Sequence, residues 1–483
     1  MNRIFLAFIL AVTALVSRAD DRPNLLLILS DDQSVPHLGC LGERAIHTPN
    51  LDRFAASGML FDKQFCGAPQ CVPSRATFLT GRSAVAVRMT RFSSPLPADV
   101  PTTADLLRAQ GYFTGICRRS FHLNGPEQRG PVTDATYKKH PELQTFSKRV
   151  DFLDVNSPRT MTVPLVNTFL DKVPAGKPFF LWASFNEPHH PWNRKGPGAS
   201  HDPLKVTVPP YLPDIPEVRK DLARYYDEIG AADEEFQWIM DILEQRGLAK
   251  NTAVFFLGDN GYAFPHGKGS LHDPGLNTPL LVRWPGKVMA GTRSSALISG
   301  EDLAPTMLEA AGAPVPKEMS GRSFLKLLLG ETFEARKYIF AERGPHGQGT
   351  FTEKTKSSSF DQSRCVRSAK FKLIYNCTPN MVYAPVDSAG DPYWKAMNKL
   401  HNEGRLEAKF ERAYFATPRP IYELYDLEKD PGEMENVAGN AEYAKVEREL
   451  KAALQDKMIL DYDYLPLPVA DKGMRKGATE EGE

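Results

Sequence analysis

The stretch that decides the fold is Asn24-Leu25-Leu26-Leu27-Ile28-Leu29-Ser30-Asp31-Asp32, an apolar run that ends abruptly on two acidic residues. The apolar residues do not alternate with polar ones, which is typical of a strand buried on both faces. Such strands belong to parallel sheets covered by helices on either side. We therefore predict a buried strand over 24–30 whose carboxyl end carries Asp31 and Asp32.

Three further segments repeat this pattern of a short apolar run followed by a polar cluster. They are Tyr112–Cys117, leading to Arg118, Arg119 and His122; Phe179–Phe185, leading to Asn186 and His189; and Thr252–Gly258, leading to Asp259 and Asn260. Helix-like stretches lie between them at Pro101–Gln110 and Val218–Gly247. Strands that alternate with helices predict an α/β fold with a large, mixed and mostly parallel sheet sandwiched by helices.

The polar clusters should meet, because ligands of such sheets bind beyond the carboxyl ends of the strands. Asp31, Asp32, Asp259 and Asn260 offer only oxygen atoms, which suit a hard cation, and a larger, flexible site suits calcium over magnesium. No set of Cys and His with zinc spacing is present. Taken alone, Asp31-Asp32 would be read as a solvated turn or a helix cap.

The remainder of the chain predicts a second, smaller domain. A boundary is expected near Glu331–Arg343, followed by strands at Phe371–Tyr375 and Tyr422–Leu427 and a helix at Ala441–Lys457. We predict a signal peptide over 1–19, a main domain carrying the site over 20–335, a C-terminal α+β domain with an antiparallel sheet over 336–469, and a flexible tail over 470–483.

The N-terminus has the composition of an export signal. Arg3 precedes an apolar run over Ile4–Val16 that is too short to span a membrane, and Ser17-Arg18-Ala19 offers small residues for cleavage after Ala19. An uncleaved anchor is the alternative. We expect a secreted or periplasmic protein with no membrane attachment after cleavage. Six cysteines then lie in a disulfide-permissive setting, and whether Cys365 pairs with Cys377 is open.

The balance of basic and acidic residues indicates which classes of partner the chain can bind. The chain has 59 basic and 59 acidic side chains, and this neutrality argues against nucleic-acid binding, which needs a basic excess. A local basic pocket for a small anion remains compatible with it.

The most specific motif is Cys71-Val72-Pro73-Ser74-Arg75, followed by Leu79-Thr80-Gly81-Arg82. Pro73 suits a first helical turn, so Cys71 would lie at a helix N-terminus, which favours an anion, with Arg75 one turn further on. The motif resembles the signature of type I sulfatases in the alkaline phosphatase superfamily. That resemblance implies an alkaline-phosphatase-like fold and oxidation of Cys71 to formylglycine by a separate maturation enzyme. A structural cysteine, bonded to Cys66, is the alternative.

The resemblance extends to the other clusters. It maps Asp31, Asp32, Asp259 and Asn260 onto the family's calcium ligands, with the modified Cys71 completing the shell. It also implies sulfate-contacting or proton-transferring roles for His189, in Phe185–Pro191, and for Lys268. The block from Gly111 to His122 departs from the pattern, since Arg118-Arg119 replaces Gly-Lys and His122 lies one position later. Arg119 is expected to take the lysine's role without being able to transfer a proton, which makes His122 a second candidate for that task.

The resemblance is closest to heparan N-sulfatases (N-sulfoglucosamine sulfohydrolases) and their bacterial relatives, on Val208–Asp214, Asp259–Pro265 and the terminal Glu423–Glu433. It implies a sulfuric ester hydrolase acting on a sulfated polysaccharide or glycosaminoglycan. The aldehyde hydrate would attack sulfur, Arg75, Arg119 and Lys268 would balance charge, and His189 or His122 would protonate the leaving atom. The sequence does not identify the sugar or distinguish O- from N-sulfate.

Two other classes compete with this interpretation. Phosphate and phosphonate hydrolases of the same fold generally use Thr or Ser with two transition metals, which the oxygen-only ligand set disfavours. A non-catalytic carbohydrate-binding protein is the other, and the intact set of site residues argues against it. Loops around His140, Trp192–Lys195 and His346 are our candidates for contacting sugar.

Overall fold

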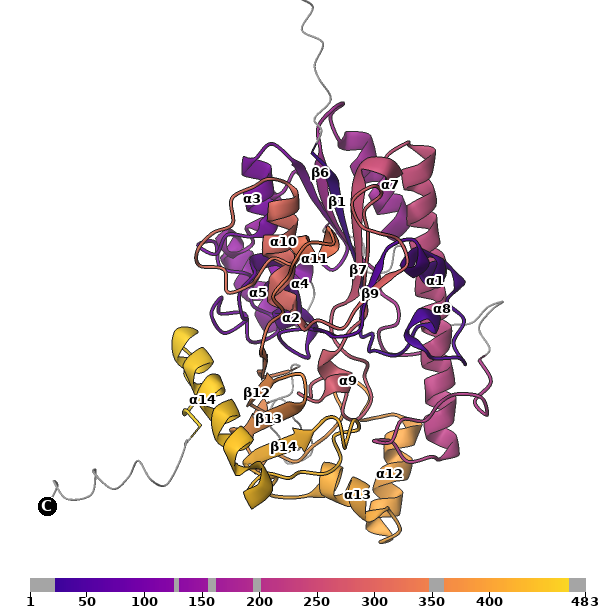
Figure 1. The fold of residues 1–483 in the computed structure, drawn as a ribbon, viewed down its shortest axis with the longest axis vertical. Helices are drawn as coiled ribbons and strands as arrows, with labels where there is room; N and C mark the ends of the chain where they lie inside the picture. The colour runs from indigo at the N-terminus through magenta and orange to yellow at the C-terminus, as the bar shows by residue number, and fades with distance from the viewer. Residues whose placement is uncertain (1–21, 126–129, 155–161, 194–200, 347–359, 469–483) are drawn as a thin grey trace, which may run out of the picture.

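The computed structural model describes residues 22–125, 130–154, 162–193, 201–346 and 360–468. Its centre is an eight-stranded sheet (Figure 1). In spatial order the strands are β5 (Phe152–Leu153), β4 (Phe113–Cys117), β6 (Phe179–Ser184), β1 (Asn24–Ser30), β7 (Thr252–Gly258), β8 (Leu280–Arg283), β2 (Met59–Phe61) and β9 (Thr292–Ser294).

Four adjacent strands of this sheet, β4, β6, β1 and β7, are the four that the apolar runs predict. These four strands pair with one another in parallel. β8 is the strand of this sheet that runs antiparallel to the others. The α/β prediction with a mostly parallel sheet is therefore confirmed. The edge strands β2 and β9 have three residues each, too short to leave a periodic signal in the sequence.

Both faces of the sheet are covered, which explains why β1 is apolar without alternation. Leu25, Leu27 and Leu29 enter one core, and Leu26 and Ile28 enter the other. Figure 1 shows the helices divided between the two sides. The first core is covered by α2 (Cys71–Thr80), α3 (Thr103–Ala109), α10 (Leu303–Ala310) and α11 (Leu325–Leu328), and the second by α1 (Pro49–Ala56), α7 (Thr162–Lys172) and α8 (Pro216–Gln245).

The C-terminal part forms an antiparallel four-stranded sheet, as predicted, of β11 (Ile339–Arg343), β12 (Ser363–Arg367), β13 (Phe371–Asn376) and β14 (Tyr422–Asp426). Helix α14 (Ala444–Leu460) packs on one face through Leu450, Leu454 and Met458. The other face contributes Cys365, Ile374 and Tyr425 to the first core of the large sheet. The two sheets therefore share a hydrophobic core.

Short elements fill the connections. They are β3 (Gln64–Phe65) paired with β10 (Ile298–Ser299), and the helices α4 (Phe121–Asn124), α5 (Pro131–Lys139), α6 (Phe146–Arg149), α9 (Asp273–Leu276), α12 (Pro392–Asn402) and α13 (Ala408–Phe410). Cys365 and Cys377 are free, and so are Cys66 and Cys71. The expected signal peptide and tail lie outside the described residues. Within the described part, no helix is long and apolar enough to cross a membrane.

A buried ion-pair network also joins the two sheets. On β13, the fully buried Lys372 Nζ lies 2.7 Å from Glu433 Oε1 and pairs with Asp273 of α9. Arg367 of β12 binds the same aspartate, with Nη2 2.8 Å from Oδ2. Asp273 follows the polar segment after β7, so the network fixes that segment against the C-terminal sheet.

We expect Lys372→Met to lower the free energy of unfolding by about 3–5 kcal/mol, because it leaves the buried carboxylate of Glu433 and the partly buried carboxylate of Asp273 short of a partner. The control is Lys370→Met, two residues earlier, which breaks an exposed pair with Glu428 and should cost less than about 1 kcal/mol. Urea denaturation of both variants measures the difference. Equal losses of unfolding free energy in the two variants would show that the ion-pair network does not stabilise the contact between the two sheets.

Candidate active site

The site begins where β1 and β7 end side by side. Ser30 is in register with Gly258, so Asp31 and Asp32 emerge next to Asp259 and Asn260. The backbone N–H of Asp32 donates to Asp259 Oδ1 at 3.0 Å, and Asn260 Nδ2 donates to Asp32 Oδ1 at 2.8 Å. All four side chains are fully buried. The structure thus brings together the four predicted metal ligands from segments more than 220 positions apart.

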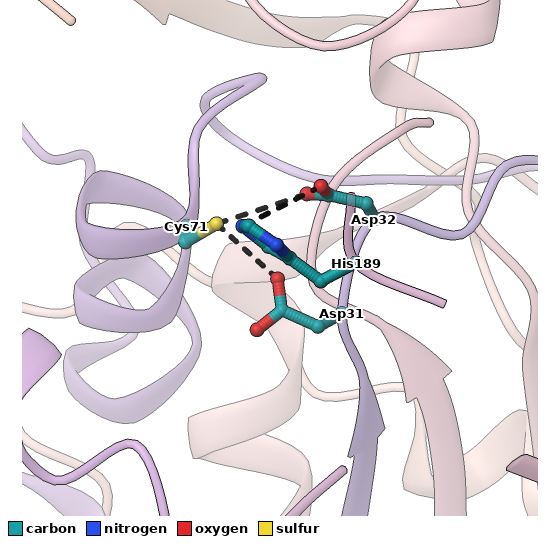
Figure 2. A group of neighbouring side chains, drawn as sticks. All are labelled: Asp31, Asp32, Cys71 and His189. Carbon is teal, nitrogen blue, oxygen red and sulfur yellow. Dashed lines mark hydrogen bonds and ion pairs between the residues drawn. The ribbon is translucent and has the colours of Figure 1, made fainter. Parts of the chain in front are cut away.

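Cys71 is the first residue of α2, and its side chain points at this cluster (Figure 2). Its Sγ lies 3.4 Å from Asp31 Oδ1 and 3.8 Å from Asp32 Oδ1. The helix is buried along its whole length and ends at Thr80, followed by Gly81, whose φ of +65° favours glycine. Burial and then the carboxylates of Asp259 and Asp31 raise the pKa of the thiol well above its usual range. Unmodified Cys71 is therefore a protonated thiol and a poor nucleophile.

Arg75 lies one turn into α2 and is fully engaged by its neighbours. Nε donates to Asp259 Oδ2 at 2.9 Å, Nη2 lies 3.1 Å from Asp31 Oδ2, and Nη1 donates to Ser184 Oγ at 2.7 Å. All three guanidinium nitrogens are thus occupied by groups at the ends of β7, β1 and β6. This geometry favours a role in orienting the two carboxylates over direct contact with a sulfuryl oxygen.

Arg119 approaches Asp31 from the end of β4. Its Nε lies 3.0 Å from Asp31 Oδ2, and its Nη2 donates to Asn186 Oδ1 at 2.8 Å. Arg118 and Arg119 have φ values of +62° and +52°, in the left-handed region that β-carbon-bearing residues rarely adopt. The unusual pair therefore sits at a sharp turn that directs Arg119 into the site, while Arg118 lies in the field of Glu235 and Glu187.

Lys268 and His189 form the other side of the site. Lys268 Nζ lies 2.9 Å from Asp32 and donates to His189 Nε2 at 3.3 Å. His189 Nδ1 donates to the carbonyl of His190, so the Nε2 lone pair faces the lysine. Burial and the charge of Lys268 lower the pKa of His189 to about 4. In the free protein the imidazole is therefore neutral and accepts a hydrogen bond.

The remaining candidate residues make contacts other than those described above. His122 on α4 packs edge-on against Phe92 and Phe121. His190 Nε2 lies 2.9 Å from Asp391 Oδ2. Of the suggested sugar-contacting loops, His140 is an exposed partner of Glu142, the buried Trp192 stacks on Phe264, and Arg194 and Lys195 lie outside the described residues. His346 lies close to the site, because its Nε2 is 3.7 Å from Oδ1 of Asp387, which contacts Lys268.

Asp387 is a site residue that sequence reasoning missed. Its Oδ2 lies 2.7 Å from Lys268 Nζ and 3.8 Å from His189 Nε2, and its Oδ1 lies 3.7 Å from His346 Nε2. The residue belongs to the long connection between β13 and α12 and has a φ of +65°. No strand end or motif marks it, so no signal in the sequence distinguishes it from other loop aspartates.

The donor set fits a divalent cation. Asn260 Oδ1 is buried without a hydrogen-bond partner in the described structure, which is costly unless a ligand takes it. Burial and then the charge of Asp31 raise the pKa of Asp259, and burial is also the main cause that raises the pKa of Asp32. Asp31, Asp32, Cys71 and His189 offer ligand atoms within 4.8 Å of one another. These buried oxygens suit calcium.

A cation would also balance the charge of the site. Asp31, Asp32, Asp259 and Asp387 face the cationic side chains of Arg75, Arg119 and Lys268. A divalent ion added to these groups leaves one net positive charge. That surplus matches the single negative charge of a sulfate ester.

Comparisons with known proteins agree with this arrangement. The family model described as Sulfatase matches residues 23–313, and the model described as N-sulphoglucosamine sulphohydrolase, C-terminal, matches residues 262–412. An ulvan-active sulfatase of Formosa agariphila is 28% identical over 479 residues, covering 93% of this chain and 77% of that protein. The N-sulphoglucosamine sulphohydrolase of Homo sapiens is 29% identical over 462 residues, covering 88% and 87%.

Solved structures share the fold. BT4656 in complex with its substrate D-glucosamine-2-N,6-O-disulfate has a TM-score of 0.65 and 22% identity, covering 92% of this chain and 99% of that one. The phosphonate monoester hydrolase of Agrobacterium radiobacter has a TM-score of 0.67 and 22% identity, covering 91% and 96%. Because the Sulfatase model spans more than half of the sequence and includes every predicted ligand and the Cys71 motif, this chain belongs to the sulfatase family and is a sulfatase.

Proposed function

We propose that this chain releases sulfate from a sulfated carbohydrate, a polysaccharide or glycosaminoglycan, with a nucleophile made from Cys71. The observation that carries the proposal is the position of Cys71 at the N-terminus of α2, with Sγ 3.4 and 3.8 Å from two buried carboxylates. Relatives named for action on ulvan and on N-sulphoglucosamine support a carbohydrate substrate.

Two groups would complete the site. Formylglycine at position 71 would supply the oxygen nucleophile, and calcium held by Asp31, Asp32, Asp259 and Asn260 would supply positive charge beside it. A maturation enzyme would install the aldehyde. The proposed export signal over 1–19 would then direct the protein to the periplasm or the outside of the cell.

The chain's own residues bind and orient the sulfate group. Arg119 pairs with Asp31 and Lys268 with Asp32, the two carboxylates beside Cys71, and both cations would stabilise the negative charge that develops on the sulfuryl oxygens. Arg75 holds Asp31 and Asp259 in place. These charges lie in a buried site, where they act more strongly than in water.

Cleavage also needs a proton for the leaving atom. The hydrogen bond from Lys268 Nζ to His189 Nε2 places a proton beside the only imidazole in the described network that contacts Asp32. His189 keeps 24% of its side chain exposed, so it faces the mouth of the site, where the sugar would lie. We therefore propose that His189 protonates the leaving oxygen or nitrogen after its Nε2 has taken a proton from Lys268 Nζ, with His122 the second candidate for this role.

N-sulfoglucosamine is the specific substrate that has support of its own. The C-terminal model matched over 262–412 is that of N-sulphoglucosamine sulphohydrolase, and the human enzyme of that name aligns along most of the chain. Phosphonate ester hydrolysis is the competing activity, since such hydrolases share the fold.

The matured protein should release sulfate from a panel of N-sulfoglucosamine, N-acetylglucosamine 6-O-sulfate and ulvan oligosaccharides, measured by ion chromatography. It should also hydrolyse 4-nitrophenyl sulfate faster than 4-nitrophenyl phosphate, because one net positive charge suits a sulfate monoanion better than a phosphate dianion. Preference for the phosphate ester, with no sulfate released from any sugar, would contradict the proposal.

Cys71→Ser and Cys71→Ala should lower sulfate release by roughly a thousandfold or more while the protein stays folded, because the proposed maturation enzyme oxidises a thiol and neither variant offers one. Cys377→Ser, outside the site, is the matched control and should keep activity. Mass spectrometry of the Cys71 peptide should show formylglycine in active material. Full activity with an unmodified thiol would refute the proposed nucleophile.

Asn260→Ala should weaken calcium binding by roughly tenfold to a hundredfold, since it removes one neutral oxygen ligand. Asn402→Ala, on the exposed end of α12, is the control. Isothermal titration with Ca²⁺ and the calcium-dependent rise in melting temperature report binding without relying on turnover. Unchanged affinity would remove Asn260 from the ligand set.

A further inference from the structure

Asp387 stands out because it is a partly exposed carboxylate in direct contact with Lys268 and close to His189. Its side chain is 31% exposed, whereas Lys268 and Asp32 beside it are each 1% exposed. Oδ2 is taken by Lys268 at 2.7 Å. Oδ1 faces His346 Nε2 at 3.7 Å, and because a carboxylate oxygen has two lone pairs, it can accept a further donor beside that imidazole.

The sulfate group itself cannot be that donor. Sulfuryl oxygens carry no hydrogen, and a carboxylate only accepts hydrogen bonds and repels a second anion. Although burial opposes ionisation, the charges of Lys268 and His346 lower the pKa of Asp387 below its usual range, so it stays an anion. Its partner in the bound state must therefore be a neutral or cationic donor on the part of the substrate that leaves.

The surrounding chain holds Asp387 firmly. On one side Val386 packs against Gly269, where a Cβ would lie 2.3 Å from Val386 Cγ2. On the other, the buried Ser388 donates to the carbonyl of Ala263 and exchanges a hydrogen bond of 2.6 Å with Tyr393. Both contacts attach Asp387 to the segment that carries Lys268. The left-handed φ at Asp387 is thus imposed by two anchored neighbours.

We propose that Asp387 is a specificity-determining residue whose Oδ1 accepts a hydrogen bond from a donor on the leaving group, either the N–H of a sulfamate or a hydroxyl beside the sulfated position. The inference rests on the proposed function, since it places the leaving group on the side of His189. Asp387 lies 3.8 Å from His189 Nε2, close enough to contact the same part of a substrate. The site would therefore select sugars, which carry such donors, over aryl sulfates, which do not.

The test is Asp387→Asn in the Cys71→Ser background, which binds without turnover. Asn suits the left-handed backbone and keeps the shape of the side chain, so the fold should be retained. Isothermal titration would use three probes: inorganic sulfate, N-sulfoglucosamine and N-acetylglucosamine 6-O-sulfate. Asp99→Asn, a surface carboxylate paired with Arg88, is the matched control for loss of one charge.

We expect Asp387→Asn to weaken binding of the recognised saccharide about tenfold to a hundredfold, the range for losing a hydrogen bond to a charged acceptor. Inorganic sulfate should bind as before or more tightly, because a nearby anion has gone. Loss confined to N-sulfoglucosamine assigns the donor to a sulfamate N–H. Loss confined to the 6-O-sulfate assigns it to a neighbouring hydroxyl.

Two outcomes overturn the inference alone. An equal loss of inorganic sulfate would show that Asp387 only positions Lys268, and unchanged binding of every saccharide would show that it reads no donor. If the Cys71→Ser parent bound none of the three probes, the proposed function would fail together with the inference. With active enzyme, Asp387→Asn should lower kcat/KM for the saccharide by a larger factor than kcat/KM for 4-nitrophenyl sulfate.

Discussion

The site depends on one guanidinium. Arg75 reaches the ends of three neighbouring strands, binding Asp31 after β1, Asp259 after β7 and Ser184 at the end of β6. A planar, permanently charged fork is suited to hold two carboxylates and a hydroxyl at fixed angles. Because Arg75 lies one turn after Cys71 on α2, the same contacts fix the start of the helix against the carboxylates. The position of Cys71 is thus set by the sheet.

The electrostatics of the site fit a bound cation. Burying several carboxylates together is unfavourable unless each has a partner, and here the side chains of Arg75, Arg119 and Lys268 partly meet that need. The buried Asn260 Oδ1 also lacks a hydrogen-bond donor within the described structure, so a positively charged ligand would satisfy it. A helix N-terminus adds partial positive charge at Cys71. The site is therefore organised to hold one more divalent charge and then one anion.

Much of the fold was predictable because strands buried on both faces leave unbroken apolar runs. β1 and β7 match the predicted ranges residue for residue, and β4 and β6 differ by one residue at an end. The candidate metal ligands could be predicted because the carboxyl ends of neighbouring parallel strands lie at the same edge of the sheet. Asp387 had no such mark, since its position arises from anchors at Val386 and Ser388. Nor did the sequence indicate that Arg75 is saturated by its neighbours, which depends on the register of β1, β6 and β7.

Arg118 and Arg119 show how a departure from the family pattern can keep the geometry. Two successive left-handed residues with side chains cost about 1–2 kcal/mol each, where the family's glycine would adopt this backbone freely. At this turn Arg119 pairs with Asp31 and donates to Asn186, and the charges of Glu235 and Glu187 partly offset the cost of burying Arg118. Replacing lysine by arginine keeps a charge beside the nucleophile and removes a group able to give up a proton. In the proposed mechanism, proton transfer would then fall to the cluster where Lys268, His189 and Asp387 meet.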